Sequence, residues 1–303
     1  MSTIWYEGGA DDAERRARLY QGHLVLYAPR PSSLRFCEFA REMIAEAFGG
    51  MDPLTAQARL PVARYVEILA ALKPAFIHHP RSKAFIQELL RDLGCDLART
   101  YFDVPRMRTA TSDNYLTSGI AYAFHPHRDT WYSAPFSQIN FWMPIYDIVA
   151  ENALAFHPYY WDHPVRNGSR EYDYARWVRE SRQTAAQHVT NDTRKQPRPE
   201  EPIALDPQVR PLVPAGGIII FSGAQLHSTV PNTSGVTRFS IDFRTVHLDD
   251  VAADRGARNI DSECTGTTMG DYLRGTDLAQ LPADLVERYE NTPARPVAAG
   301  AGA

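Results

Sequence analysis

Apolar side chains in the first hundred residues recur mainly at the spacing of an α-helix. In the run 34–48 they lie three or four positions apart, and either Ser32 or Ser33 can cap its amino end. Two more runs with this period are 62–72 and 81–93. Gly94 follows the second run and can end that helix. The pattern predicts a helical layer over about residues 10–97.

From about residue 98 the period changes from that of helices to that of strands. Short segments rich in aromatic and β-branched residues follow one another, and turn signals such as Pro231-Asn232 separate several of them. The predicted strands are 100–111, 119–124, 136–145, 153–156, 217–221 and 236–246. Helices first and strands afterwards predict an α+β fold, with a mainly antiparallel β core over about 98–248 and helices packed against it.

Two segments interrupt the predicted strands. Residues 172–187 have the pattern of a helix, and 190–202 are polar and rich in proline. We expect the stretch 161–202 to be an insertion that covers a site as a lid, with a plain surface loop as the alternative.

The end of the chain has a different character from the core. A last helix is predicted over 282–289, with proline tolerated in its first turn. The low-complexity residues 293–303 are expected to be disordered. Residues 1–292 are therefore expected to form a single domain.

Composition and charge exclude several classes of protein. Of the 303 residues, 44% are hydrophobic and 22% charged, values typical of a globular domain, and the net charge of -4 gives no basic field for nucleic acid. No apolar run approaches the ~20 residues that cross a bilayer, and no secretory signal is visible. Three cysteines without CxxC spacing indicate a reducing compartment. We therefore expect a cytoplasmic protein without a membrane partner.

The densest cluster of reactive side chains is His125-Pro126-His127-Arg128-Asp129, after the strand predicted to end at Phe124. Residues two apart in an extended segment project to the same face, so His127 and Asp129 can bind one metal ion as part of a 2-His-1-carboxylate triad. A second His-x-Asp match, His247-Leu248-Asp249, has no histidine after it that could complete such a triad. Position therefore favours the first match.

The third ligand must come from a later strand. The histidines after Asp129 are His157, His163, His188, His227 and His247. Of these, His227 lies just beyond the apolar strand 217–221, and Arg238 and Ser240 follow on one face of the next strand. An arginine with nearby hydroxyls can hold the distal carboxylate of a dicarboxylic cosubstrate, although arginine is too common in this chain for spacing alone to decide.

Taken in order, these features resemble the phytanoyl-CoA dioxygenase (PhyH) branch of the Fe(II)/2-oxoglutarate oxygenases over roughly residues 100–246. The family's His-x-Asp pair matches His127 and Asp129. Its distal histidine, followed by Pro-Asn-x-Ser and then Arg, matches His227, residues 231–234 and Arg238.

Three further positions are similar to the family pattern. Thr229 stands where the family has a hydroxyl two residues after the distal histidine, and Trp142 lies ten residues before Asn152, as the family's tryptophan does before its asparagine. Where the family usually has Pro-Gly-Ser-His, this chain reads Pro158-Tyr159-Tyr160-Trp161. The resemblance therefore does not extend to the identity of the substrate.

The resemblance implies a double-stranded β-helix, which is a jelly-roll, cupin-like core. It also implies an iron- and 2-oxoglutarate-dependent dioxygenase that uses O2 to oxidise, most often to hydroxylate, a C–H bond of a small metabolite. Fe(II) would be held by His127, Asp129 and His227. The expected cosubstrate contacts are Arg238, Thr229, Trp142, Ser240, Asn140 and Gln138.

Two alternatives from other classes stay open at this point. One is a non-redox jelly-roll metalloenzyme, such as an isomerase or hydrolase, and the other is a ligand-binding jelly roll without catalysis. The amides Gln138 and Asn140 alternate onto the face of Trp142 and bind a ligand or each other. Arg106 or Arg108 can enter the pocket. The sequence does not indicate an oligomeric state.

Overall fold

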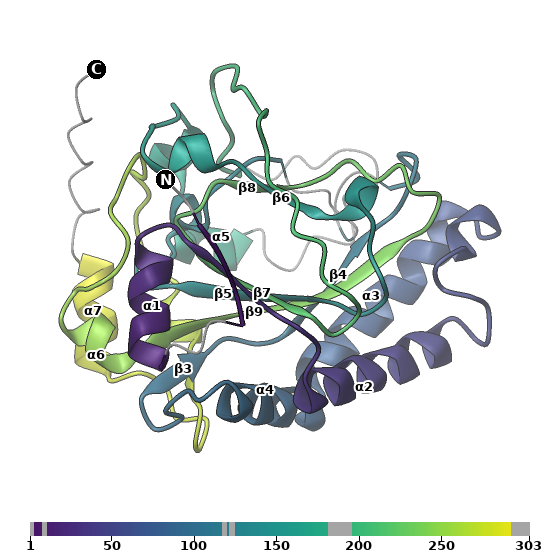
Figure 1. Ribbon diagram of the computed structural model, residues 1–303, viewed down its shortest axis with the longest axis horizontal. Coiled ribbons are helices and arrows are strands. Elements are labelled where there is room, and N and C mark those ends of the chain that lie inside the picture. Colours follow the sequence, from purple (N-terminus) through teal and green to yellow (C-terminus); the bar gives the residue numbers. More distant parts are fainter. Residues whose placement is uncertain (1–2, 8–10, 117–119, 121–124, 181–195, 292–303) are drawn as a thin grey trace.

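A large sheet of eight strands and a small sheet of two make up the β structure of the described residues, which are 3–7, 11–116, 120, 125–180 and 196–291 of this computed structural model (Figure 1). The strand order in the large sheet is β1-β2-β7-β5-β9-β3-β10, with β4 also paired to β9, and every pair apart from β1–β2 is antiparallel. Its strands are β1 (Ile4–Tyr6), β2 (Leu24–Tyr27), β3 (Thr100–Phe102), β4 (Arg106–Ala110), β5 (Ile139–Pro144), β7 (Ile218–Ser222), β9 (Arg238–His247) and β10 (Leu273–Arg274). The small sheet pairs β6 (Leu154–Phe156) with β8 (His227–Thr229).

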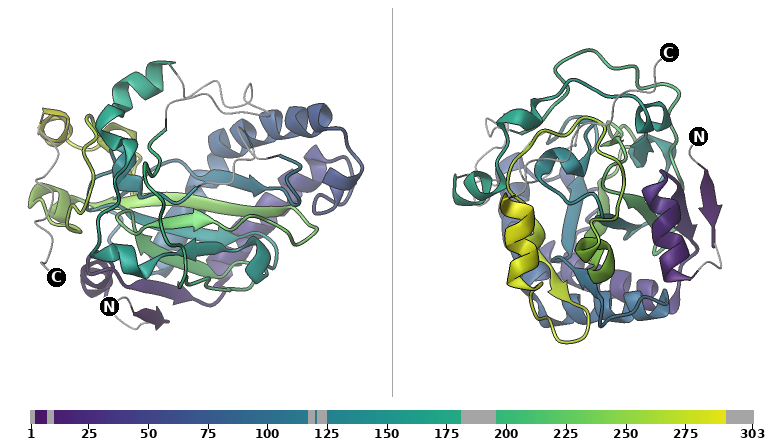
Figure 2. Two further views of the ribbon diagram at one scale, coloured as in Figure 1. Left: turned by 90° about the horizontal axis from the view of Figure 1, so that it is seen from above. Right: turned by 90° about the vertical axis from the view of Figure 1, so that its left-hand side faces the viewer.

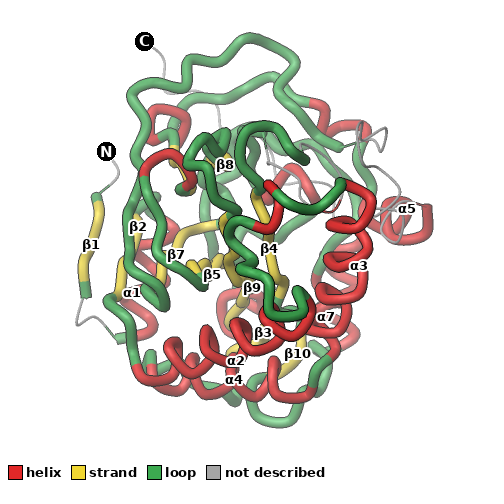
Figure 3. Tube along the Cα trace, turned by 90° about the vertical axis from the view of Figure 1, so that its right-hand side faces the viewer, coloured by secondary structure: helices red, strands yellow, loops and turns green. Residues whose placement is uncertain are grey.

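Helices cover one face of the large sheet and loops form most of the layer on the other. In Figure 3 the helices α2 and α4 lie below the strands, and loops lie above them. The sheet-covering helices are α2 (Pro31–Ala47), α3 (Val62–His78) and α4 (Pro80–Asp92), and α1 (Asp12–Tyr20) contacts β2 and β7. The short helices α6 (Leu248–Ala252) and α7 (Ala283–Asn291) pack together at one end (Figure 2). Among the described helices, including α5 (Tyr174–Glu180), none has the length and apolar character needed to span a membrane.

Alternation along β5 and β9 separates the two faces of the sheet. Phe141 of β5 and Phe243 of β9 point into the core between sheet and helices, where their rings stack with centroids 4.8 Å apart. Asn140 and Trp142 project to the other face. The alternation expected from the sequence of this strand is therefore confirmed, and the face opposite the helices is free to carry a site.

The helices predicted before residue 97 are present in the structure, but some of them begin or end at other residues than predicted. The first sheet-covering helix begins at Pro31, so neither Ser32 nor Ser33 is its N-cap; Ser33 lies inside the first turn, where its hydroxyl accepts from the backbone N–H of Arg30 at 2.9 Å. Helix α3 continues through a proline to His78, beyond the predicted end at residue 72. The reason is burial: Phe76, in the added turn, is fully buried in the core.

Several strand boundaries also differ from the prediction. The segment 100–111 forms two strands, β3 and β4, separated at residues 103–105, which end in a proline. Strand β2 was not expected in a region interpreted as helical throughout; its four apolar residues are all buried beside β7. The predicted strand 119–124, most of the second half of the predicted helix 172–187 and the predicted tail 293–303 lie outside the described residues.

A buried ion pair holds together several loop segments that pack over the large sheet. Arg128 is 1% exposed, and its Nε donates to both carboxylate oxygens of Asp261 at 3.0 and 3.1 Å. Its other nitrogens donate to the carbonyls of Ala224 and Tyr160. Asp261 also accepts from the indole N–H of Trp131 at 2.7 Å. This one carboxylate therefore joins parts of the chain more than 100 residues apart.

We expect Asp261→Ala to lower the free energy of unfolding by about 3–5 kcal/mol, because removing one partner leaves the Arg128 charge buried and unpaired. Chemical denaturation measures the change. The matched control is Asp162→Ala, which breaks an ion pair with Arg258 whose side chains are 48% and 63% exposed. That loss should cost at most about 1 kcal/mol. Equal costs for the two variants would contradict a structural role for the buried pair.

Candidate metal centre and cosubstrate pocket

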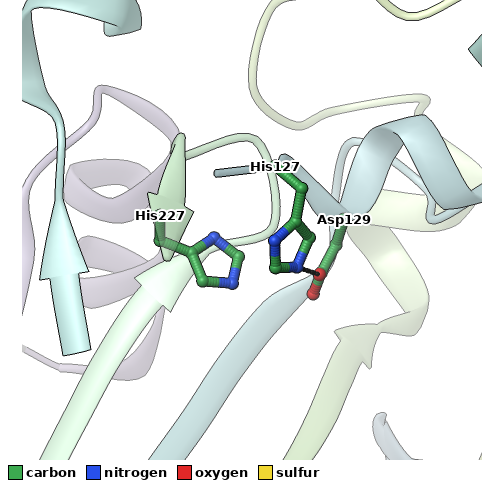
Figure 4. A group of neighbouring side chains, drawn as sticks. All are labelled: His127, Asp129 and His227. Atoms are coloured by element: carbon green, nitrogen blue, oxygen red, sulfur yellow. Dashed lines mark ion pairs between the residues drawn. The ribbon is translucent and has the colours of Figure 1, made fainter. Parts of the chain in front are cut away.

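His127 and His227 face each other across an antiparallel backbone pair. Each backbone N–H donates to the carbonyl of the other residue at 3.0 Å, which makes them directly opposed neighbours. Their side chains therefore project to the same side, and the ring centroids lie 4.3 Å apart. Figure 4 shows both imidazoles turned toward a common point beside the carboxylate of Asp129.

The hydrogen bonds of the two imidazoles select the nitrogen that is free to bind a metal. Nδ1 of His127 contacts the carbonyl of His125 at 2.8 Å, and Nδ1 of His227 contacts the carbonyl of Gln225 at 3.0 Å. A carbonyl only accepts, so each Nδ1 carries the proton and each Nε2 keeps its lone pair for a ligand. Burial, and then the neighbouring His127, lowers the pKa of His227 to about 3, which keeps this imidazole neutral.

Asp129 begins a short 3-10 helix, η3 (Asp129–Tyr132), and presents one oxygen to the histidines. Its Oδ1 lies 3.5 Å from Nε2 of His127. Its Oδ2 accepts from the side-chain amides of Gln138 and Asn140, each at 2.7 Å. Because Oδ2 is already bonded to two amides, Oδ1 is the oxygen left for a metal ion.

The two amides are themselves held in place. The second N–H of the Gln138 amide donates to Oδ1 of Asn140 at 2.8 Å, and Oε1 of Gln138 accepts from the hydroxyl of Tyr272 at 2.7 Å. Arg244, opposite Asn140 in the sheet, brings its Nε to 3.8 Å from Oδ2 of Asp129. Burial raises the pKa of the Asp129 carboxyl, but the contact with His127 and the charge of Arg244 outweigh it and hold that pKa well below its ordinary value.

These observations fit an iron site. One ligand atom from each of His127, Asp129 and His227 lies within 4.8 Å of the others, and all three residues are buried. Two neutral imidazoles and one carboxylate are the donor set of non-haem Fe(II) oxygenases.

A cavity of about 320 Å³ opens beside the candidate ligands. Its lining includes Trp142, Leu154, Phe221, Thr229 and Arg238, among which Leu154 pairs with Thr229 and Arg238 lies beside Trp142. The rest is lined by charged residues of β4 and β9 and by aromatic residues of the segment 172–177. The lining therefore has a mainly apolar part with one arginine, here called the apolar end, and a part with more polar residues, the polar end.

Arg238 is 5% exposed and lies at the mainly apolar end. Its Nη1 donates to the carbonyl of Asn152 at 2.9 Å, and its Cζ lies 5.5 Å from the ring centroid of Trp142. Its Nε is buried and has no hydrogen-bond partner in the described part of the chain. Burial lowers the pKa of Arg238 to about 10, so the guanidinium stays charged at neutral pH. A buried cation with an unused donor fits a carboxylate ligand.

The other expected cosubstrate contacts fall into three groups. Thr229 and Trp142 line the cavity, as Arg238 does. Ser240 is fully buried, and the cavity-lining residues do not include it. Gln138 and Asn140 also line the cavity, but their amides bond Asp129 and each other, so any contact with cosubstrate would be additional to that role.

Three contributors were not identified in the sequence as parts of the site: Arg244, Tyr272 and the aromatic residues of the segment 172–177. Arg244 and Tyr272 reach Asp129 directly or through Gln138, and their only sequence signal is the alternation that puts Arg244 on the face of Arg238. The aromatic residues of the segment 172–177 line the cavity from the predicted insertion. His125, two positions before His127 and expected on its face, supports this ligand through its backbone carbonyl, which accepts from the ring of His127.

The comparison with protein families identifies the class. Residues 58–240 match the family "Phytanoyl-CoA dioxygenase (PhyH)", so the chain belongs to the PhyH family of Fe(II)/2-oxoglutarate-dependent dioxygenases. Iron and 2-oxoglutarate are its cofactor and cosubstrate, and His127, Asp129 and His227 are the candidate iron ligands. The family decides against the non-redox metalloenzyme and against the non-catalytic binding protein.

Solved structures give only distant likenesses. The carbocyclase SnoK from nogalamycin biosynthesis is 13% identical, with a TM-score of 0.39 over 80% of this chain and 85% of that one. The epimerase SnoN in complex with Fe3+, alpha ketoglutarate and nogalamycin RO is 15% identical, with a TM-score of 0.36 over 78% and 85%. AviO1 from Streptomyces viridochromogenes Tue57 is 12% identical, with a TM-score of 0.37 over 78% and 95%. The search of curated proteins found no significant match.

We expect Asn140→Ala to weaken Fe(II) binding roughly 10- to 100-fold, because Oδ2 of Asp129 loses one of its two amide donors and the carboxylate loses its orientation. Anaerobic titration with Fe(II) measures the affinity. The control is Gln208→Ala, whose amide bonds Asp206 and Arg210 outside the cavity. Unchanged iron affinity in Asn140→Ala would mean that this amide does not support the metal ligand.

Proposed function

We propose that this dioxygenase oxidises a C–H bond of a small molecule, with hydroxylation as the usual outcome. The observation that carries the proposal is the pairing of two features in one cavity: three convergent candidate ligands and, at the apolar end, a buried arginine with an unused donor. The polar end of the cavity is left for a substrate beside the cosubstrate.

The residues of the chain have separable tasks in this reaction. His127, Asp129 and His227 would hold Fe(II), which supplies the activation of dioxygen coupled to decarboxylation of 2-oxoglutarate to succinate and carbon dioxide. Arg238 binds the distal carboxylate of 2-oxoglutarate, and the ring of Trp142 limits access of water to that ion pair. The protein thus positions the reactants, and its mainly apolar end strengthens their electrostatic contacts.

We further propose that 1–292 form one domain around a double-stranded β-helix. The small sheet of β6 and β8 would be the remnant of the second layer, facing β2, β7, β5, β9 and β4 of the large sheet. Two observations support this: Phe156 of β6 packs edge-on against Phe221 of β7 with ring centroids 4.9 Å apart, and the His127–His227 pair extends the small sheet by one more bridge.

The function is tested by following succinate formation. We expect Asp129→Ala to lose nearly all 2-oxoglutarate turnover and bound iron, because the triad keeps only its two neutral ligands. Asp249→Ala is the matched control, since Asp249 belongs to the other His-x-Asp match and is 40% exposed in its ion pair with Arg99. Iron binding and succinate release that survive in both His127→Ala and Asp129→Ala would overturn the assignment.

Arg238→Ala should raise the 2-oxoglutarate KM far more than the KM of the prime substrate. Losing a charge pair of this kind costs on the order of 2–5 kcal/mol when the partner stays buried. Arg238→Lys should restore only part of the affinity because an ammonium lacks the planar fork. Arg258→Ala, at a side chain 63% exposed, is the control. A 2-oxoglutarate KM unchanged in Arg238→Ala would assign the carboxylate to another residue.

The insertion 161–202 is proposed to act as a lid over the iron. Support comes from its described ends: Tyr172 and Trp177 line the cavity, and the carbonyl of Pro197 accepts from the hydroxyl of Tyr132 at 3.1 Å and contacts Nε2 of His125 at 2.9 Å. His125 lies two residues before the candidate ligand His127, and Tyr132 lies three residues after the candidate ligand Asp129. A closed lid would exclude water while the substrate is oxidised.

Hydrogen exchange tests the lid. With a redox-inert divalent metal and 2-oxoglutarate bound, addition of a substrate found by turnover should increase protection in 161–180 and 196–202. Helix α2 in the core serves as the internal reference and should be protected in both states. Tyr132→Phe, which removes one bond to Pro197, should reduce the gain. Equal protection with and without substrate would make the insertion an ordinary surface segment.

A further inference from the structure

The β4 side of the cavity carries more positive than negative charge. Four cationic side chains lie there, and two carboxylates face them. The cations are Lys73, Arg106, Arg108 and Arg244, and the carboxylates are Asp103 and Asp242. A cavity wall of this composition favours an anionic occupant.

The ion pairs show where the excess lies. Arg108 and Asp242 form a two-point pair, with Nε to Oδ1 at 2.6 Å and Nη2 to Oδ2 at 3.2 Å. Arg106 and Arg244 share the oxygen Oδ2 of Asp103 through one nitrogen each. Arg244 also lies 3.8 Å from Asp129 and 3.7 Å from Asp242, so Arg106 is the less completely paired of these two arginines. The Nε and second terminal nitrogen of Arg106 donate to no protein group in the described part of the chain.

Lys73 is the second uncompensated cation. It reaches the cavity from α3, and its Nζ donates to the carbonyl of Ile120, with no carboxylate in ion-pair range among the described residues. Burial, and then the charge of Arg108, lowers the pKa of Lys73 to about 7. An anion next to this ammonium would restore the charged form.

Iron and 2-oxoglutarate do not neutralise the excess positive charge of the β4 side. At the metal end the two charges of Fe(II) and the one of Arg238 balance Asp129 and the two carboxylates of 2-oxoglutarate. The remaining acid on the wall, Asp271, accepts a hydrogen bond from the hydroxyl of Tyr174. Even with Asp271 counted, one positive charge is left over in the loaded cavity when Lys73 is protonated.

Aromatic rings form another part of the wall. Tyr132 packs edge-on against the ring of His127 at 5.5 Å between centroids, Tyr172 against Tyr132 at 5.3 Å, and Trp177 continues the row at 5.9 Å from Tyr172. All three line the cavity. They offer an apolar surface that begins at a candidate iron ligand.

We propose that the prime substrate is a ring-containing molecule with an acidic group, a carboxylate or a phosphate, and that Arg106 and Lys73 bind this group while the aromatic row contacts the ring. The inference rests on the proposed function, because it assigns iron and 2-oxoglutarate to the other end of the cavity. A neutral substrate would instead leave two nitrogens of Arg106 without an acceptor and Lys73 without a counter-charge among the described residues.

The test uses matched pairs of probes on the anaerobic protein loaded with Fe(II) and 2-oxoglutarate. Carboxylic acids with one to three fused rings are compared with their primary amides, and aryl phosphates with the parent phenols, by titration calorimetry. The acidic member should bind at least about tenfold more tightly in the best pairs. Preference for carboxylate or for phosphate then names the acidic group.

Two variants assign the preference to residues. Arg106→Gln and Lys73→Met should each reduce the affinity for the acidic probe roughly tenfold and leave the neutral partner and 2-oxoglutarate unaffected. Arg64→Gln, on the same helix as Lys73 but 60% exposed and outside the cavity, is the control and should change nothing. Using two variants guards against loss of folding in either one.

The possible failures are distinguishable. Protein that binds no 2-oxoglutarate would contradict the proposed function itself. Normal 2-oxoglutarate binding without preference for any acidic probe, including no binding of either member, would overturn the substrate class alone. Acidic probes that displace 2-oxoglutarate, or a preference that both variants retain, would overturn it equally, because the acid would then bind elsewhere.

Discussion

The reciprocal backbone hydrogen bonds between His127 and His227 are the constraint on which the site depends. Two residues paired in this way must project their side chains to one side of the chain pair, whatever the surrounding loops do. Since Asp129 is two residues from His127, it returns to the same side as the chain enters its 3-10 turn. Arg128, between them, is buried against Asp261 instead. The backbone pair of His127 and His227 thus brings together ligand atoms from residues 100 positions apart in the sequence.

Burial makes the cluster useful and also costly. A buried carboxylate is stable only when its oxygens are bonded, and Asp129 meets this condition on one side with the amides of Gln138 and Asn140. The hydroxyl of Tyr272 completes the network at Gln138, so the amides have no freedom to rotate. The same arrangement that lowers the cost of burial fixes the orientation of the remaining oxygen. The stability of the buried carboxylate and the orientation of its metal-facing oxygen therefore have a common cause.

The sequence was sufficient for what depends on spacing and not for what depends on tertiary contact. The His127 and Asp129 spacing and the alternation of β5 are local, and both agree with the structure. Strand β2 was missed because a run of four apolar residues has no period that distinguishes strand from helix. The partnership of Asp129 with Gln138 was missed because an amide in a strand gives no sign of what it bonds. Asp261 likewise gave no local signal.

Arginine illustrates this limit, because a chain with 32 basic residues, nearly all of them arginine, gives no reason to single one out. The structure separates them by the bonds their nitrogens make. Arg128 uses all three of its nitrogens on protein acceptors and is 1% exposed, which defines a structural role. Arg238 is also buried, at 5% exposed, but keeps an Nε without a partner among the described residues. A buried arginine with an unused donor lowers the stability of the fold unless a ligand accepts from that donor. The number of unused donors therefore distinguishes an arginine that binds a ligand from one with a structural role.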